Sequence, residues 1–207
     1  EIHKYANWST EIKNIYDSFP SLKVVYTGSS ILDLEKGGAD LSRRKLQYHM
    51  QGLSLREFVE LKYGYKIRQH SLQELIDGKI DWPYDALKPL PVMAEYLQYG
   101  YYPYFTDGHF HEHLHSSLLQ TLEVDIPTFA QMNVGTTRKL KTLLGIIAAS
   151  VPFKPNMQAI ARDLGISRNG ISDLLFYLEK AGVIMQLRQT TEGIALLGKV
   201  EKVYLNN

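Results

Sequence analysis

The stretch Ala161-Arg-Asp-Leu-Gly-Ile-Ser-Arg-Asn-Gly-Ile171 decides the fold of the C-terminal third of this 207-residue chain. Gly165 permits a tight turn between two segments whose apolar residues have helical spacing, and Ser167 is placed to cap the second segment. The small side chain of Ala161 lets two helices cross closely, and isoleucines fill the core between them. This pattern predicts a helix-turn-helix.

The residues around this motif predict a winged helix-turn-helix domain. Its other elements follow from helical spacing, capping residues and strand-like runs: a helix at residues 138–149, caps at Asn156 and Gly182, and strands of a β-wing at residues 183–189 and 199–205.

The N-terminal part of the chain has a helical pattern followed by two strand-like runs. Apolar residues between Trp8 and Phe19 have helical spacing, and Pro20 ends this helix. Residues 23–27 form a short, β-branched apolar run, which predicts a buried strand. Residues 45–50 alternate between polar and apolar side chains, which predicts a second, half-exposed strand.

Two capping boxes mark helix starts in the middle of the chain. They pair Ser54 with Glu57 and Ser71 with Glu74, so that each side chain satisfies a free backbone N–H group of the first turn. Residues 77–91 are rich in Pro and Gly and predict a loop or domain seam. Helical patterns resume at residues 92–99 and 112–122.

The composition is that of a soluble globular protein, with 44% hydrophobic and 22% charged residues, and excludes collagen-like and disordered chains. Without a run of eighteen apolar residues or an apolar signal-peptide core, we expect no membrane partner. The absence of cysteine excludes disulfides and thiolate metal sites, and we expect a cytoplasmic protein.

Charge is distributed unevenly along the chain. Residues 138–207 carry ten Lys or Arg and five Asp or Glu, whereas residues 1–137 carry thirteen and seventeen. A basic C-terminal third joined to an acidic body predicts two modules with different partners.

Five stretches, taken in order and followed by the winged helix, resemble one family. They are Glu1-Ile-His-Lys-Tyr5, Lys23-Val-Val-Tyr-Thr-Gly-Ser-Ser30, Asp40-Leu-Ser-Arg-Arg44, Gly52-Leu-Ser-Leu-Arg-Glu-Phe58 and Tyr96-Leu-Gln-Tyr-Gly-Tyr-Tyr-Pro103. The series is similar to the bacterial and archaeal AAA+-like P-loop ATPases whose Walker B strand ends in Asp-Glu-Ile-His-Lys.

The resemblance implies a mostly α chain that begins with an α/β remnant of a P-loop NTPase (AAA+) core. Its domains would be the C-terminal part of that core at residues 1–62, a helical lid or linker at residues 63–136, and the winged helix-turn-helix domain at residues 137–207. Members of the family usually continue into a nuclease-like domain, which we do not expect within these 207 residues.

No G-x-x-x-x-G-K-[ST] motif occurs in the 207 residues, and the resemblance begins at the end of the Walker B motif. We therefore expect a fragment of a switch ATPase that lacks the Walker A half. ATP and Mg²⁺ would be cofactors of the intact parent, and none is expected in this fragment, which should not hydrolyse ATP.

The resemblance implies catalytic roles for three residues and sensor roles for two. Glu1 matches the glutamate that polarises the attacking water, and Ser29 and Ser30 match a sensor near the γ-phosphate. Arg43 and Arg44 are candidate arginine fingers, directed to their own nucleotide or to that of a neighbour in a homo-oligomer. The ordinary alternatives are a frayed terminus, turn serines and solvated cations.

Gly100 and Pro103 match an element that packs a proline against adenine in related ATPases. Tyr101 replaces the second glycine of this element, so the close backbone approach that a glycine allows is in question. A helix that ends in glycine and proline is the alternative.

Four histidines, at positions 109, 111, 113 and 115, alternate with other residues. On a helix they form two i,i+4 pairs on different faces. No Asp or Cys completes a ligand set, and the family pattern has no metal here. We therefore expect no metal site.

The winged helix could make two kinds of contact: docking within the protein or on a protein partner, and DNA binding. The alternative function of the chain is that of a DNA-binding transcriptional regulator. The candidate DNA contacts are Arg162, Arg168, Asn169, Lys180, Arg188 and Lys199. Asp173 and Glu179 oppose the positive field, which favours docking.

Overall fold

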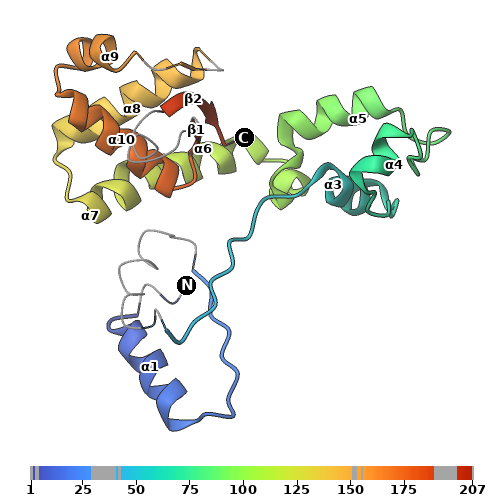
Figure 1. The fold of residues 1–207 in the computed structure, drawn as a ribbon, viewed down its shortest axis with the longest axis horizontal. Helices are drawn as coiled ribbons and strands as arrows, with labels where there is room; N and C mark the ends of the chain where they lie inside the picture. Colours follow the sequence, from blue (N-terminus) through green and yellow to red (C-terminus); the bar gives the residue numbers. More distant parts are fainter. Residues whose placement is uncertain are drawn as a thin grey trace. The chain divides into compact units, whose positions relative to one another are not determined.

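The computed structural model describes residues 2, 5–28, 41, 43–150, 153, 154, 156–188 and 200–206. The described chain is mostly helical, with one small sheet of two strands (Figure 1). Contacts divide it into two compact units, one of residues 1–47 with 117–206 and the other mainly of residues 48–116. The domain boundaries expected after residues 62 and 136 stay predictions.

Helix α1 (Trp8–Ser18) confirms the first helical pattern. Trp8 at its start is only 6% exposed. The Trp8 ring packs against the Tyr26 ring, with a distance of 5.5 Å between the ring centroids. This contact holds the beginning of α1 against the run at residues 23–27.

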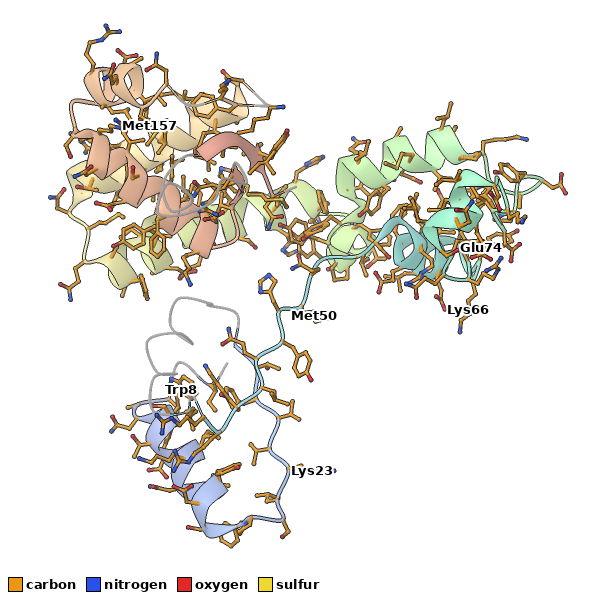
Figure 2. The ribbon with its side chains drawn as sticks, in the orientation of Figure 1. Trp8, Lys23, Met50, Lys66, Glu74 and Met157 are labelled. Atoms are coloured by element: carbon orange, nitrogen blue, oxygen red, sulfur yellow. The ribbon has the colours of Figure 1, made fainter. Side chains whose placement is uncertain are left out.

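Both strand predictions for the N-terminal part are wrong. Residues 22–28 and 45–50 are extended but pair with no strand among the described residues, and Figure 2 shows Lys23 and Met50 on such extended chain. Val25 is 90% exposed and Met50 is 96% exposed. Apolar, β-branched side chains favour packing in a sheet. A β-strand forms, however, only where a second strand lies beside it and pairs with its backbone hydrogen-bonding groups.

The unit of residues 48–116 is built from short helices. These are α3 (Leu55–Tyr63), α4 (Leu72–Ile76), α5 (Pro89–Glu95), the π-helix η3 (Tyr96–Gly100), the 3₁₀ helix η4 (Pro103–Asp107) and the beginning of α6 (Phe110–Gln120). Both predicted capping boxes are confirmed, at the starts of α3 and α4. The helix predicted from residue 92 begins earlier, because Pro89 occupies the first turn of α5, where a missing N–H group costs nothing.

The core of this unit is small. Phe58, Val59, Leu87 and Val92 are buried, and aromatic side chains pack around them. The Phe58 ring lies 5.0 Å from that of Phe105 and 5.7 Å from that of Tyr96, measured between centroids. Aromatic packing therefore replaces much of the aliphatic core that a longer helical unit would have.

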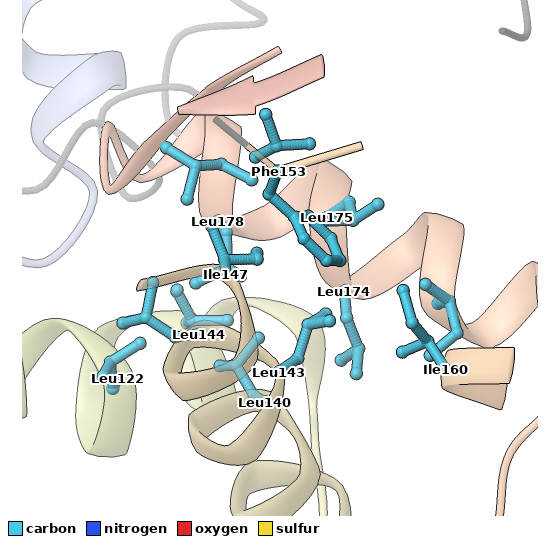
Figure 3. Close-up of a cluster of buried hydrophobic side chains, with 14 residues drawn as sticks. Leu122, Leu140, Leu143, Leu144, Ile147, Phe153, Ile160, Leu174, Leu175 and Leu178 are labelled. Carbon is cyan, nitrogen blue, oxygen red and sulfur yellow. The ribbon is translucent and has the colours of Figure 1, made fainter. Parts of the chain in front are cut away.

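The C-terminal region carries the larger core. Its elements are the π-helix η5 (Thr121–Asp125), α7 (Ile126–Ala130), α8 (Val134–Ala148), α9 (Met157–Leu164), α10 (Arg168–Lys180) and the antiparallel strands β1 (Ile184–Arg188) and β2 (Val200–Leu205). Fourteen buried apolar residues from these elements and from Phe153 form one cluster, which Figure 3 shows.

The local signals of this region are confirmed. The side chains of Asn156 and Ser167 accept hydrogen bonds from the first turns of α9 and α10, and Gly165 ends α9 with a φ of 60°. Helix α8 begins four residues before its predicted start because Asn133 caps it there. Among the described helices, none combines the length and apolar character needed to cross a bilayer.

Candidate functional site

The N-terminal segment brings two predicted ATP-site stretches together. The backbone N–H of Ile2 donates to the carbonyl oxygen of Thr27 over 3.2 Å. Glu1, Ser29 and Ser30 lie outside the described residues. The hydrogen bond nevertheless places the residue after Glu1 beside the end of the 23–27 run, where a Walker B segment and a sensor segment would share one phosphate.

The two candidate arginine fingers have different surroundings. Arg44 donates from Nε to Oδ1 of Asp17 over 2.9 Å and from Nη2 to Oδ2 over 3.2 Å, which ties the 43–45 turn to α1. Arg43 is exposed, and among the described residues its guanidinium has no ion-pair partner. Arg43 is therefore the one whose side chain is available to a ligand.

Gly100 and Tyr101 join two sequence stretches that are almost fifty residues apart. The Leu53 N–H donates to the carbonyl oxygen of Tyr101 over 2.7 Å, and the Tyr101 ring lies directly on Gly52. A Cβ on Gly100 would lie 2.6 Å from Tyr96 and 2.9 Å from Phe58. Both glycines are thus required for packing within this unit.

Pro103, the proposed adenine contact, begins η4 and is exposed. Its neighbours Tyr102 and Tyr104 stack with centroids 5.2 Å apart and planes 11° apart. Pro103 therefore lies in the chain between two tyrosines whose rings stack on each other.

A polar cluster in the core of the same unit was not found from the sequence. Glu95 accepts hydrogen bonds from Lys62 Nζ, the Tyr63 hydroxyl and the Tyr99 hydroxyl, and Lys62 Nζ also donates to Tyr99 over 2.9 Å. The ammonium lies 4.8 Å from the centroid of the Tyr99 ring and 5.6 Å from that of Phe58. This arrangement compensates a charge pair that is partly removed from water.

The electrostatics of this cluster favour the ionised pair. Burial alone would raise the pKa of Glu95, but the hydrogen bonds from Lys62, Tyr63 and Tyr99 outweigh it and lower the pKa from 4.5 to about 2. Burial would likewise lower the pKa of Lys62, and its bonds to Glu95 and Tyr99 raise it instead. The only sequence signal was the i,i+4 spacing of Glu95 and Tyr99, which identifies no partner on α3.

The candidate DNA contacts differ in their availability. Arg168 and Asn169 lie exposed in the first turn of α10, and Arg162 is exposed beside Asp163 on α9. Lys180 lies over the Phe176 ring at 6.0 Å. Lys199 lies outside the described residues.

Arg188 is held by an acidic residue of α10. Its Nη2 lies 2.5 Å from Oε2 of Glu179, whose carboxylate also accepts from the backbone and side-chain nitrogens of Gln186. Glu179 therefore connects β1 to α10 and neutralises Arg188 at the same time.

Two family models match this chain. Residues 1–59 match a family described as an AAA domain. Residues 91–207, more than half of the chain, match a family described as a domain of unknown function (DUF8612). The chain belongs to this second family. No curated protein and no solved structure matches it.

The two matches divide the candidate residues of this DUF8612 chain. The AAA-like segment contains the Ile2–Thr27 hydrogen bond, Arg43 and the Arg44–Asp17 pair. The DUF8612 segment contains Gly100 and all the candidate DNA contacts. The family description names no activity, so function has to be argued from the residues.

Proposed function

We propose that this DUF8612 chain is part of an AAA+-like switch ATPase and that its first 59 residues supply one side of the ATP site. The observation that carries this proposal is the Ile2–Thr27 hydrogen bond inside the segment that matches an AAA domain. Glu1 would polarise the attacking water, and Ser29 and Ser30 would sense the γ-phosphate. Arg43 would stabilise the charge that develops on it.

The phosphate-binding side of the site has to come from outside these 207 residues, which contain no Walker A motif. ATP with Mg²⁺ is the cofactor that we propose for the complete site. The finger would act on the nucleotide of its own subunit or on that of a neighbour in a homo-oligomer, and the exposure of Arg43 is compatible with both.

The test uses the natural protein that contains these residues, with whatever sequence flanks them. Replacing Glu1 by Gln should preserve ATP binding and reduce turnover by about a hundredfold or more, because loss of a catalytic base has that scale. Glu11→Gln, at an exposed position in the first turn of α1, is the matched control. Equal turnover in both variants would remove Glu1 from the mechanism.

We further propose that α8, α9, α10 and the β1–β2 sheet form a winged helix-turn-helix module. The caps of α9 and α10 and the left-handed Gly165 between them support this interpretation. Its exposed first turn at Arg168 and Asn169 is where such modules present side chains to DNA.

Two partners fit this module, and the Glu179–Arg188 pair favours one of them. With Arg188 neutralised and Asp173 exposed on α10, the positive field is weaker than a non-specific DNA binder needs. We therefore propose docking on the ATPase or a protein partner as the main role. A DNA-binding regulator is the second candidate, supported by Arg168 and Asn169.

A further inference from the structure

Helix α6 (Phe110–Gln120) contains two histidines that are one helical turn apart. His111 and His115 are exposed, the His111 ring meets the Phe110 ring edge-on with centroids 5.5 Å apart, and within the described part of the chain neither imidazole has a hydrogen-bond partner. Side chains with this i,i+4 spacing have Cβ atoms about 5–6 Å apart and lie about 40° apart around the helix. Both rings can therefore reach one ion above the same face.

The other histidine pair is also exposed but differs in its place on the helix. His109 precedes the first residue of α6, and the His113 ring is tilted against the Tyr104 ring with centroids 5.8 Å apart. His113 lies about 200° around the helix from His111, on the opposite face. His113 is thus a histidine of the same helix that cannot join the His111–His115 pair.

Neutral imidazole is the commonest metal ligand in proteins and suits Cu²⁺, Ni²⁺ and Zn²⁺. Two histidines at i,i+4 on a helix are also the ligand pair of H-E-x-x-H zinc sites, and Glu112 follows His111 here as in that motif. Among the described residues, however, no group of three His, Asp or Glu could surround an ion. The pair would therefore leave the remaining coordination positions to water.

Contrary to the expectation from the sequence that these histidines hold no metal, we propose that His111 and His115 form a two-histidine binding site for a divalent transition-metal ion, with affinity for Cu²⁺ above that for Ni²⁺ and Zn²⁺. The order follows the general preference of nitrogen ligands among these ions. This site is independent of the proposed ATPase function, because it lies on α6 and uses none of the ATP-site candidates.

The test is a calorimetric titration of the untagged chain with Cu²⁺ in a non-coordinating buffer. We expect one ion to bind, and His111→Ala or His115→Ala to weaken its binding at least tenfold, because either change breaks the chelate. His113→Ala is the matched control and should leave the affinity unchanged. Because both pair members are exposed, the metal-free variants should have the Tm of the original chain.

A register variant separates chelation from a simple count of histidines. His113→Ala, His115→Ala and Ser116→His together keep six histidines, the same number as His113→Ala alone, but place the second imidazole about 140° around the helix from His111 and within one turn of no other histidine. It should bind Cu²⁺ as weakly as His115→Ala alone. The proposal is overturned if this variant keeps the original affinity, if His115→Ala has no effect, or if His113→Ala weakens binding as much.

Discussion

Arg44 donates two parallel hydrogen bonds to Asp17, whereas Arg43, the adjacent residue, is exposed. The bidentate geometry fixes the Arg44 guanidinium against α1. An arginine finger instead needs a guanidinium that is free to approach the phosphate of a bound nucleotide. The two arginines therefore have separable roles: Arg44 anchors the turn, and Arg43 is the residue that we propose as the arginine finger.

Replacement of Arg43 by Ala in the natural protein should slow ATP hydrolysis at least tenfold and leave nucleotide affinity nearly unchanged. Arg44→Ala should reduce the free energy of unfolding by about 1 kcal/mol or less, because the pair with Asp17 is partly exposed. Steady-state turnover, nucleotide titration and urea unfolding measure these effects. Asp17→Asn should reproduce the effect of Arg44→Ala, and a turnover defect confined to Arg44→Ala would reverse the assignment.

Removal of the charge on Glu95 should destabilise the unit of residues 48–116. In Glu95→Gln the Lys62 ammonium and two tyrosine hydroxyls lose a charged acceptor, and we expect the free energy of unfolding to fall by about 1–3 kcal/mol near neutral pH. Glu60→Gln, at an exposed position of α3, is the control and should change it by less than about 0.5 kcal/mol. Equal losses in the two variants would contradict a special role for Glu95.

The same carboxylate predicts a pH dependence. The pKa of Glu95 is about 2 in the folded protein and 4.5 as its ordinary value, so the unfolded chain takes up the proton first as the pH falls. Its stabilising contribution is therefore complete above about pH 4.5 and is lost between that pH and about 2. The difference in unfolding free energy between the original chain and Glu95→Gln should shrink across this range. A constant difference, measured by urea unfolding at several pH values, would show that the carboxylate does not carry the effect.

Signals that depend on neighbouring residues in the sequence could be predicted, and those that depend on distant partners could not. The capping residues Ser54 and Ser167 each act within three residues, so their helices began where we expected. Lys62 and Glu95 come from different helices, and no periodicity links them. The strand expected at residues 23–27 failed because its pattern says nothing about whether a second strand lies beside it.

The two glycines at positions 100 and 145 predict opposite responses to the same change. A Cβ on Gly100 would lie 2.6 Å from Tyr96, so Gly100→Ala should lower the free energy of unfolding by about 1–3 kcal/mol through overpacking. Gly145 lies inside α8, and outside the adjacent helix backbone no atom lies within 4 Å of such a Cβ, so Gly145→Ala should raise the free energy of unfolding by about 0.5–1 kcal/mol. Thermal and urea unfolding of both variants test this. An unchanged or higher free energy of unfolding for Gly100→Ala would mean that space around Gly100 does not limit its replacement, and a loss for Gly145→Ala would contradict the helix-propensity argument.

The sequence predicts which residue types could form a site, but it does not predict which other side chains contact them. Arg168 and Arg188 are equivalent in a count of positive charge, but the structure pairs only Arg188 with Glu179. Gly100 likewise resembled a nucleotide contact, and its closest neighbours are the rings of Tyr96 and Phe58. Availability to a ligand is a property of the tertiary structure, which no spacing along the chain reports.

The Glu179–Arg188 pair leads to the last prediction, which concerns DNA. Any DNA affinity of this chain should depend on Arg168 and little on Arg188, since the latter is already neutralised. Arg168→Ala should weaken binding about equally for unrelated sequences and make the slope of log affinity against log salt shallower by about one. Arg188→Ala should leave that slope unchanged.

Glu179→Gln provides the complementary experiment, because it releases Arg188 and removes a negative charge from the same face. It should tighten DNA binding and steepen the salt slope by about one, while lowering the free energy of unfolding because Gln186 also loses its acceptor. Fluorescence anisotropy at several salt concentrations measures both quantities. Equal salt slopes for Arg168→Ala and Arg188→Ala would contradict the pairing argument. If instead Arg168→Ala leaves DNA binding untouched and alters ATP turnover in the natural protein, this face docks on the ATPase, as the acidic residues of α10 favour.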